Sequence, residues 1–366
     1  MCRMLKVGMV VNFLPDENHH GGVAYQVHTL ANKLSKEFDI TIFAINQTDL
    51  IHNYKNIKVK LPGFLTKNRF LEIIFFPLFV RFQTFKQFDI FHTHGDDFLF
   101  FFLRKPIIRT FYGSALGEFR TASANKRKLH QFFRYFAEYL SGFYAKMNVG
   151  ISFSTKKYLP FINEIIPCGI DLEKFKPSNK KSEHPSILFV GTIEGRKRGW
   201  FLAKVFKNWI KPKIPDAELW VVSSEKVEGE DIKWFGHIPE EKLIELYQKA
   251  WVFCLPSLYE GFGVPYIEAM ACGTAVVTTP NSGAMEVLKN GKYGIIVNDK
   301  LLGTSITWIL KNKNLRAKYV KEGLKRVQEF SWNNIGGRYL KLYNFLLMRK
   351  IDFSKILGHQ NNDRKR

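Results

Sequence analysis

Short apolar runs alternate with helix-like segments along the chain, and this alternation begins within the first ten residues. The run at 6–11 reads as a buried strand, and apolar positions with helical spacing follow at 23–36. Further strands are predicted at 40–44, 57–61, 90–92, 107–111 and 146–150. Strands that alternate with helices are typical of parallel sheets that carry helices on both faces. The predicted fold class is therefore α/β.

The same alternation starts a second time after a polar segment. The segment 177–185 (PSNKKSEHP) is poor in apolar residues, which favours a linker. Strands are predicted beyond it at 186–190, 218–222, 233–235, 251–255, 275–278 and 294–297, with a helix at 240–249 between them. A chain of 366 residues is long enough for two hydrophobic cores. We therefore predict two doubly wound, Rossmann-like domains that face a central cleft.

These patterns set the expected domain boundaries. We expect a first domain at 1–176, a second at 186–330, a helix at 331–350 that crosses back to the first domain, and a tail at 351–366 whose final residues, 358–366, are disordered. In doubly wound domains, ligands bind at the carboxyl ends of the strands. The predicted binding site is consequently the cleft between the two domains.

Positive charge dominates the composition. There are 55 Lys and Arg against 33 Asp and Glu, which gives a formal net charge of +22. Such an excess indicates an anionic partner, either a nucleic acid, an anionic membrane or a phosphorylated substrate, unless it is a solvated basic surface without a partner. The sequence has no helix-turn-helix, RNP or zinc-finger signature, so nucleic acid is not an expected partner.

The cysteines and the apolar runs indicate where the protein resides. The four cysteines, at 2, 168, 254 and 272, form no C-x-x-C pair. This distribution favours a reducing compartment over a disulfide framework. The Phe-rich runs at 73–82 and 98–103 are too short to span a bilayer. We expect a cytoplasmic protein, either free or peripheral on the inner face of the cell membrane.

The most informative segment for chemistry is 251–287. A predicted strand leads into a loop that holds Glu260, Gly261 and Gly263, and Pro265 then suits the first turn of a helix. The start of that helix offers free N–H groups and a positive dipole end to an anion, and the glycines allow a diphosphate to approach the backbone. Glu268, about one turn into the helix, can accept hydrogen bonds from a ribose diol. The alternative is that both carboxylates are merely solvated charges at a helix start.

The surroundings of Glu260 and Glu268, PSLYEGFGVPYIEAMACGTAVV, resemble the retaining glycosyltransferases of family 4, which have the GT-B fold. FVGTIEGRKRG at 189–199 resembles the phosphate-binding loop of that family, and IPCGIDLEKFKP at 166–177 resembles its interdomain segment. The resemblance implies transfer of a hexose from a nucleotide-diphospho-sugar to a glycan or lipid-linked acceptor. It also implies that no cofactor and no metal take part.

The resemblance assigns roles to the second domain. Glu260 would position the donor sugar, and Glu268 would bind the nucleotide ribose. Backbone N–H groups at Gly261, Phe262, Gly263 and Val264 would hold the diphosphate. Thr192 stands where relatives commonly have an arginine, so the phosphate contacts are placed on Arg196 and Lys197, with Arg198 as a substitute. The predicted catalytic residues are Glu260, Arg196 and Lys197.

The first domain would supply the acceptor side. By resemblance, the loop with Gly21 and Gly22 approaches the donor phosphates, whereas the neighbouring His19 and His20 are interpreted as ordinary loop residues. His94, Tyr112 and Ser114 are predicted on the side of the acceptor or the donor sugar, with His94 facing the cleft. Many relatives carry a histidine where Tyr112 stands, and a phenol cannot replace imidazole as a base near neutral pH.

No metal site is expected. His92 and His94 form a His-x-His pair, but no third ligand is evident near them. Asp96 and Asp97 are adjacent and do not form a D-x-D motif, so they are interpreted as loop residues. Basic side chains and the helix dipole would then stabilise the leaving diphosphate.

Two mechanisms and two enzyme classes remain open at this point. A retaining transfer can use a carboxylate nucleophile, for which Glu260 is the candidate in sequence. The resemblance favours a same-face route in which the departing phosphate oxygen takes the acceptor proton. The alternative function is a nucleotide-sugar epimerase with the GT-B fold, which would act without an acceptor.

Two segments of the first domain mix phenylalanine with basic residues. From 104 to 134, eight Lys or Arg accompany a single acidic residue, and the segment 64–88 combines Phe with further Lys and Arg. Exposed aromatic rings with a positive surround would suit an anionic membrane face. If the rings instead fill the core between helices, the charges are simply solvated.

Overall fold

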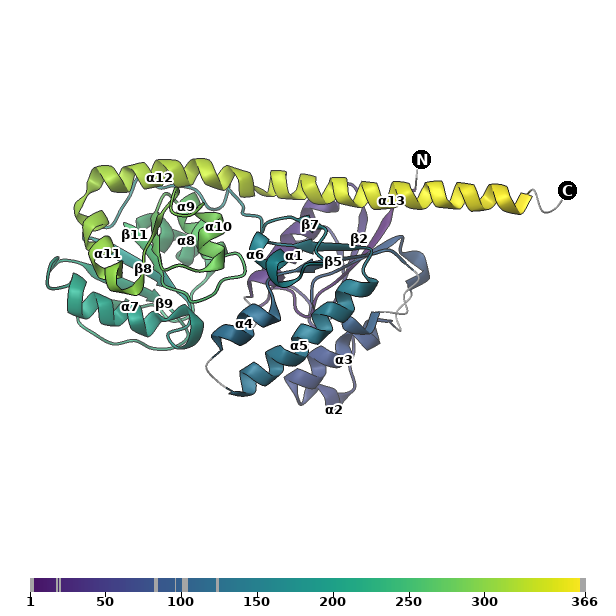
Figure 1. Cartoon of the computed structure of the whole chain (residues 1–366), viewed down its shortest axis with the longest axis horizontal. Helices are drawn as coiled ribbons and strands as arrows, with labels where there is room; N and C mark the ends of the chain where they lie inside the picture. Colours follow the sequence, from purple (N-terminus) through teal and green to yellow (C-terminus); the bar gives the residue numbers. More distant parts are fainter. Residues whose placement is uncertain are drawn as a thin grey trace.

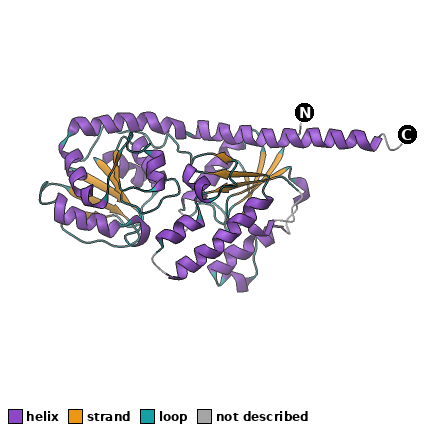
Figure 2. Cartoon of the chain, viewed as in Figure 1, coloured by secondary structure: helices purple, strands orange, loops and turns teal. Residues whose placement is uncertain are grey.

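The computed structural model describes residues 3–17, 19, 21–81, 85–95, 97–100, 105–122 and 125–362. Among the residues named above, His20, Asp96, Arg104 and the end of the tail at 363–366 lie outside this set. The described strands form two separate sheets, each covered by helices (Figures 1 and 2). We call the halves built around these sheets the first lobe and the second lobe.

Seven strands form the sheet of the first lobe within the described residues, in the order β3-β2-β1-β4-β5-β6-β7. Every recorded pairing is parallel, for example Val7 beside Ile40 and Ile90. The strands are β1 (Lys6–Val10), β2 (Asp39–Ala44), β3 (Lys55–Lys58), β4 (Ile90–Thr93), β5 (Ile107–Phe111), β6 (Met147–Gly150) and β7 (Glu164–Ile165). The two-residue strand β7 was not predicted from the sequence because it is too short to show a pattern.

The sheet of the second lobe repeats this arrangement with six described strands in the order β10-β9-β8-β11-β12-β13, again all parallel. They are β8 (Ser186–Val190), β9 (Glu218–Val222), β10 (Ile232–Trp234), β11 (Val252–Leu255), β12 (Ala275–Thr278) and β13 (Ile295–Ile296). In both sheets the strand order reverses direction beside the first strand, which is the doubly wound topology. The predicted α/β architecture of two Rossmann-like domains is thereby confirmed.

Helices connect the strands on both faces of each sheet (Figure 2). In the first lobe they are α1 (Gly22–Leu34), α2 (Gly63–Thr66), α3 (Arg69–Arg81), α4 (Ala115–Thr121), α5 (Asn125–Tyr144) and α6 (Phe153–Tyr158). In the second lobe they are α7 (Gly199–Val205), α8 (Glu240–Lys249), α9 (Val264–Ala271), α10 (Ser282–Val287), α11 (Leu302–Lys311) and α12 (Lys313–Val327). The C-terminal helix α13 spans Trp332–Asn362.

Helix α13 returns from the second lobe to the first (Figure 1). Trp332, Tyr339 and Tyr343 are buried in the same cluster as Val7 and other strand residues of the first lobe. Tyr343 binds the buried His92 through a hydrogen bond of 2.6 Å between the hydroxyl and Nδ1. Helix α13 therefore completes the hydrophobic core of the first lobe, although the whole second lobe separates the two in the sequence.

The predicted disordered tail needs a correction. Helix α13 continues to Asn362 and so includes most of the tail at 351–366 and the first five of the residues, 358–366, that we expected to be disordered. The stretch IDFSKIL at 351–357 contains neither glycine nor proline, and apolar residues recur in it. Such a sequence has no signal that would end a helix at 350.

Close contacts join the lobes on one side of the molecule. The Tyr259 hydroxyl accepts a hydrogen bond from the Ser114 amide at 3.1 Å. The Tyr259 ring lies over Gly117, where a Cβ atom would come within 2.6 Å of it, and the Tyr112 carbonyl oxygen lies 2.8 Å from the place of a Cβ on Gly261. Glycine at 117 and 261 thus allows the second-lobe loop to touch the first lobe.

No helix within the described parts of the chain combines the length and the apolar character that a membrane crossing requires.

Candidate functional site

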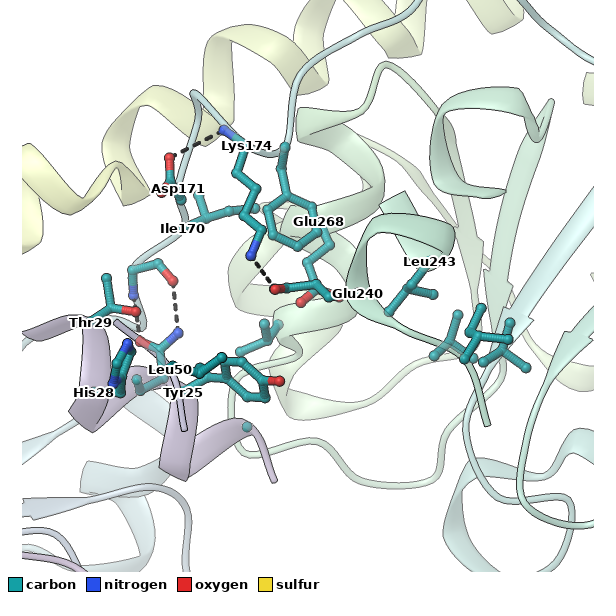
Figure 3. Close-up of a pocket in the computed structure, with 18 of the residues that line it drawn as sticks. Tyr25, His28, Thr29, Leu50, Ile170, Asp171, Lys174, Glu240, Leu243 and Glu268 are labelled. Atoms are coloured by element: carbon teal, nitrogen blue, oxygen red, sulfur yellow. Dashed lines mark hydrogen bonds and ion pairs between the residues drawn. The ribbon is translucent and has the colours of Figure 1, made fainter. Parts of the chain in front are cut away.

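A cavity of about 860 Å³ lies between the lobes, and both lobes contribute to its wall (Figure 3). Helix α1 supplies Gly22 and Tyr25 from the first lobe. The loop after β8 supplies Lys197, and helix α9 supplies Val264 and Glu268 from the second lobe. Since α1 follows β1 and the other two segments follow β8 and β11, the cavity lies at the carboxyl ends of the strands beside both switch points.

Lys197 reaches the cavity because Gly191 leaves room for its side chain. A Cβ atom on Gly191 would lie 2.4 Å from Cδ of Lys197, and the φ angle of Gly191 is +154°. Burial lowers the pKa of Lys197, although the carboxylates of Glu260 and Glu268 act in the opposite direction. The ammonium group is therefore a partly desolvated cation that faces the cavity, which suits a phosphate group.

Glu268 lies on the helix that the sequence predicted, and its carboxylate accepts a hydrogen bond of 2.9 Å from the Tyr247 hydroxyl. Burial raises the pKa of Glu268 to about 7, while the bond from Tyr247 and the charge of Lys197 act against this rise. The carboxyl group is consequently poised to change its charge near neutral pH, and a ligand that bonds to the carboxylate would favour ionisation.

The start of α9 has the geometry that the glycine pattern predicted. Gly263 is the N-cap residue with a φ of 95°, in the left-handed region that favours glycine, and proline follows in the first turn. Val264, the first residue of the helix, lines the cavity. Of the predicted amide positions, Gly261 faces Tyr112 of the first lobe instead, and Phe262 is buried.

Arg196 and Lys197 point in different directions although they are neighbours. Arg196 donates to the Tyr259 carbonyl at 2.5 Å and forms an ion pair of 2.8 Å with Oε1 of Glu260. Ser257 donates to the same oxygen at 2.8 Å. Arg196 and Glu260 do not belong to the cavity wall in this structure, and the ion pair with Arg196 holds the Glu260 carboxylate in place.

Arg198 is not a substitute for these two cations. Its guanidinium donates to the Pro256 carbonyl at 2.7 Å and forms an ion pair with Asp299 at 2.7 Å. The residue has a φ of 55° and is buried. Because both contacts lie within the second lobe, Arg198 fixes the fold of the loop rather than facing a ligand.

The predicted residues of the first lobe separate into two groups. Gly22 lines the cavity, and Gly21 precedes it as the N-cap of α1. His94, Tyr112 and Ser114 lie outside the cavity wall: Nδ1 of His94 is 3.1 Å from the Tyr112 hydroxyl, and the Ser114 side chain caps α4.

His94 does not face the cleft as we expected. It is 2 % exposed, its ring lies against His92 at 3.8 Å between centroids with a tilt of 42°, and burial lowers the pKa of His94 well below its usual range. Strand residues alternate between faces, but β4 is central in the sheet and covered on both faces, so alternation alone could not identify an open side.

Several cavity residues were not identified from the sequence. Lys174 forms an ion pair with Glu240 at the start of α8, so these two side chains bridge the cavity wall (Figure 3). Ser223 and Ser224 follow β9, and His237 follows β10. A signal was available for Ser223, Ser224 and His237, because they come shortly after predicted strands of the second lobe, where doubly wound domains bind ligands. Lys174 and Glu240 do not follow such a strand, so this signal was absent for them.

No group of three or more His, Cys, Asp or Glu side chains is arranged to hold a metal ion within the described ranges. The His-x-His pair, His92 and His94, is the pair that we considered from the sequence as metal ligands. His92 bonds to Tyr343 and Thr110 instead, and Asp97 is ion-paired with Arg109 at 3.2 Å. His19, which we interpreted as a loop residue, bonds to Asp16 at 2.8 Å.

Comparisons with known proteins agree with this architecture. The family profile "Glycosyltransferase Family 4" matches residues 20–174, and "Glycosyl transferases group 1" matches residues 171–326. Among curated relatives, an N,N'-diacetylbacillosaminyl-diphospho-undecaprenol alpha-1,3-N-acetylgalactosaminyltransferase of Campylobacter jejuni is 36% identical over 48% of this chain and 52% of its own length. The O-antigen chain mannosyltransferase B of Escherichia coli is 30% identical over 43% of this chain and 45% of its own length. The chain thus spans about half the length of the curated relatives it matches.

Solved structures match over nearly the whole chain. Sucrose-phosphate synthase from Thermosynechococcus elongatus has a TM-score of 0.76 at 20% identity and covers 94% of this chain and 100% of its own. An Anabaena protein, HepE, in complex with UDP-glucose has a TM-score of 0.74 at 14% identity, covering 93% of this chain and 99% of its own. These similarities show the fold, and the two profiles together with the Glu260–Glu268 motif show that the chain belongs to glycosyltransferase family 4, with the GT-B fold.

Proposed function

We propose that this protein transfers a hexose from a nucleotide-diphospho-sugar to a glycan or lipid-linked acceptor, without a metal ion and with retention of the anomeric configuration. The observation that carries the proposal is the cavity between the lobes, where Lys197 and Glu268 face the same space beside the start of α9. A cation for the diphosphate and a carboxylate for the ribose are thereby presented together.

The relatives support transfer over epimerisation. Those reported above are named as an N-acetylgalactosaminyltransferase, a mannosyltransferase and a synthase. The names of further relatives, the phosphatidyl-myo-inositol mannosyltransferases, and the diphospho-undecaprenol in the name of the Campylobacter protein refer to lipid acceptors. We propose a lipid-linked saccharide as the acceptor class and retain 1–176 and 186–330 as the acceptor and donor domains.

The donor would be held mainly by the second lobe. Lys197 neutralises the diphosphate together with the backbone N–H groups at the start of α9, and Glu268 accepts hydrogen bonds from the ribose hydroxyls. Glu260 orients the sugar. Its carboxylate lies outside the cavity wall in this structure, where Arg196 and Ser257 fix its orientation, so the sugar end of the donor has to extend past that wall to reach it.

The reaction route that we propose proceeds on one face of the sugar. The bond between the anomeric carbon and the phosphate oxygen breaks, the acceptor oxygen bonds to that carbon, and the departing phosphate oxygen takes the acceptor proton. Lys197 stabilises the charge that develops on the diphosphate. Neither His94, which is buried with a lowered pKa, nor Tyr112 is required as a base on this route.

Binding and turnover experiments test the proposal. A thermal-shift screen with a panel of nucleotide-diphospho-sugars should show stabilisation by at least one donor. With that donor and lipid-linked saccharide acceptors, transfer should persist in EDTA and should nearly vanish in Glu260→Ala. Analysis of the product linkage then decides whether configuration is retained. A product formed from donor alone, or wild-type turnover in Glu260→Ala, would contradict the proposal.

A further inference from the structure

Helix α5 exposes a continuous stripe of large apolar side chains. Phe143 is 90% exposed, Phe133 59% and Phe136 56%, and Leu129, Phe132 and Leu140 are also exposed. Positions 129, 133, 136, 140 and 143 follow the spacing of one helix face. Phe132 contacts Phe136 edge to face at 5.0 Å, so the rings form one surface rather than scattered exposures. We call this surface the α5 stripe.

The α5 stripe is exposed although the helix itself is firmly attached. On the opposite side of α5, Glu138 accepts two bonds from the Ala115 amide, at 3.0 and 3.1 Å. Ser141 donates to the buried Asp97 at 2.8 Å, and Gln131 donates to Glu118 at 2.9 Å. The polar side of the amphipathic helix therefore faces the protein, whereas the aromatic side faces outward, which is the reverse of a core helix.

Positive charge accompanies the α5 stripe. The helix carries Lys126, Arg127, Lys128 and Arg134, and its single acidic residue is Glu138. Glu138 is the residue that bonds inward to the start of α4. Its negative charge is consequently directed at the first lobe, where Glu118 of α4 also pairs with Arg127 at 3.4 Å, and basic residues still outnumber acidic ones along α5.

We propose that the α5 stripe docks on an anionic lipid surface. Phenylalanine and leucine would enter the boundary between headgroups and acyl chains, and the basic residues would contact anionic headgroups. A second copy of this chain is a poorer occupant, because pairing of two α5 helices would bring their basic residues together. In Figure 1, α5 lies with α2 and α3 on the side of the first lobe away from α13.

Docking there would hold the reaction site beside the bilayer. Glu138 of α5 binds the first amide of α4, and the loop before α4 contains Tyr112, which touches Gly261 next to Glu260. Only helix α5 and the hydrogen bonds from Glu138 to the start of α4 therefore lie between the α5 stripe and this loop. This placement goes beyond the proposed transfer reaction, and the docking can be tested without any donor or acceptor.

Flotation with lipid vesicles tests the docking. The full chain should float with vesicles that contain phosphatidylglycerol and much less with pure phosphatidylcholine. Phe133→Ser with Phe136→Ser should weaken partitioning by about a hundredfold, or about tenfold per ring, and Lys128→Glu by about tenfold. Trp308→Ser on α11 and Lys318→Glu on α12, which alter exposed positions in the second lobe, should float like the wild type.

Three results would overturn the docking proposal. The first is a wild-type chain that does not bind anionic vesicles, and the second is a double phenylalanine variant that binds as well as the wild type. The third is a dimer in light scattering that the same double variant dissolves, which would assign the α5 stripe to a second copy. An unchanged melting temperature in the double variant excludes misfolding as the cause of lost binding, whatever the outcome of the transfer assay.

Discussion

Lys197 provides the most direct test at the scale of single residues, because its ammonium group faces the cavity while its neighbour Arg196 is bound to Glu260. Lys197→Ala should weaken binding of the donor identified in the screen by about 1.5–3 kcal/mol, the value of a charge-assisted hydrogen bond. Lys204→Ala, an exposed lysine on α7, is the matched control. Isothermal titration of both variants measures the effect, and unchanged affinity in Lys197→Ala would remove the phosphate contact.

Glu268 should make donor binding depend on pH. Burial raises its pKa to about 7, so the carboxylate that accepts the ribose hydrogen bonds becomes more abundant between pH 6 and 8. Affinity for a nucleotide-diphospho-sugar, whose phosphates do not titrate in this range, should therefore rise with pH in the wild type. In Glu268→Gln the affinity should be lower and nearly independent of pH, and a parallel rise in this variant would contradict the assignment.

Ionisation of Glu268 should lower the stability of the unliganded protein as the pH rises, whereas it raises the affinity for the donor. A carboxyl whose pKa is higher in the folded state contributes stability below its ordinary pKa of 4.5 and loses it as the pH rises through about 7. Glu268→Gln should thus match the wild type near pH 4 and exceed it at pH 8 by about 2–3 kcal/mol. Thermal unfolding across this range measures the difference, and a constant offset between the proteins would argue against the raised pKa.

The sequence predicted the site residues whose position follows from the backbone. It did not predict those whose role depends on the direction in which the side chain points. Gly263 and Glu268 follow from the strand–loop–helix pattern, and the structure places them as that pattern predicts. Arg196 and Lys197 differ because they lie in the 3-10 turn Gly195–Lys197, in which consecutive side chains point about 120° apart. No spacing rule in the sequence contains that information.

At the scale of elements, α13 should be essential to the first lobe although the family profiles end before it. Tyr343→Phe should lower the free energy of unfolding by about 1–3 kcal/mol, because the buried His92 would lose its partner at Nδ1. Tyr343→Ala should lower it by about 3–5 kcal/mol through the cavity it leaves. Phe345→Ala, an exposed neighbour on the same helix, should change little, and denaturant unfolding compares the three.

The sequence also predicted the existence of elements better than their orientation. Helix α8 and strands β5, β8, β9 and β12 have the predicted bounds because their apolar patterns are strong. The aromatic rings of the first lobe were ambiguous, since periodicity does not distinguish a face turned inward from one turned outward. The structure separates them: Phe76 and Phe88 are buried, whereas Phe133 and Phe143 are exposed.

At the scale of the whole molecule, the repeated alternation of strands and helices predicted two lobes, but not how they touch. That contact depends on Tyr259, whose ring lies over Gly117 and whose hydroxyl accepts from the Ser114 amide. These residues are more than a hundred positions apart in the sequence, and nothing in either segment alone identifies the other. The contact matters for function because Tyr259 directly precedes Glu260.

Gly117→Ala should therefore separate the lobes. The new Cβ atom would lie 2.6 Å from the Tyr259 ring, which no real contact allows, so the ring must leave its place and the loop with Glu260 must move with it. We expect a larger radius of gyration in solution scattering and at least a tenfold loss of transfer, in line with the sensitivity of catalysis to misplacement by about 1 Å. Gly337→Ala on α13, where nothing lies within 4 Å of the added atom, should instead leave shape and activity unchanged and add stability of about 0.5–1 kcal/mol.

If the clash at Tyr259 is the cause, Gly117→Ala should add little to the defect of Tyr259→Ala, because the ring is already absent. Additive losses in the double variant would show that Gly117 acts through something other than this contact.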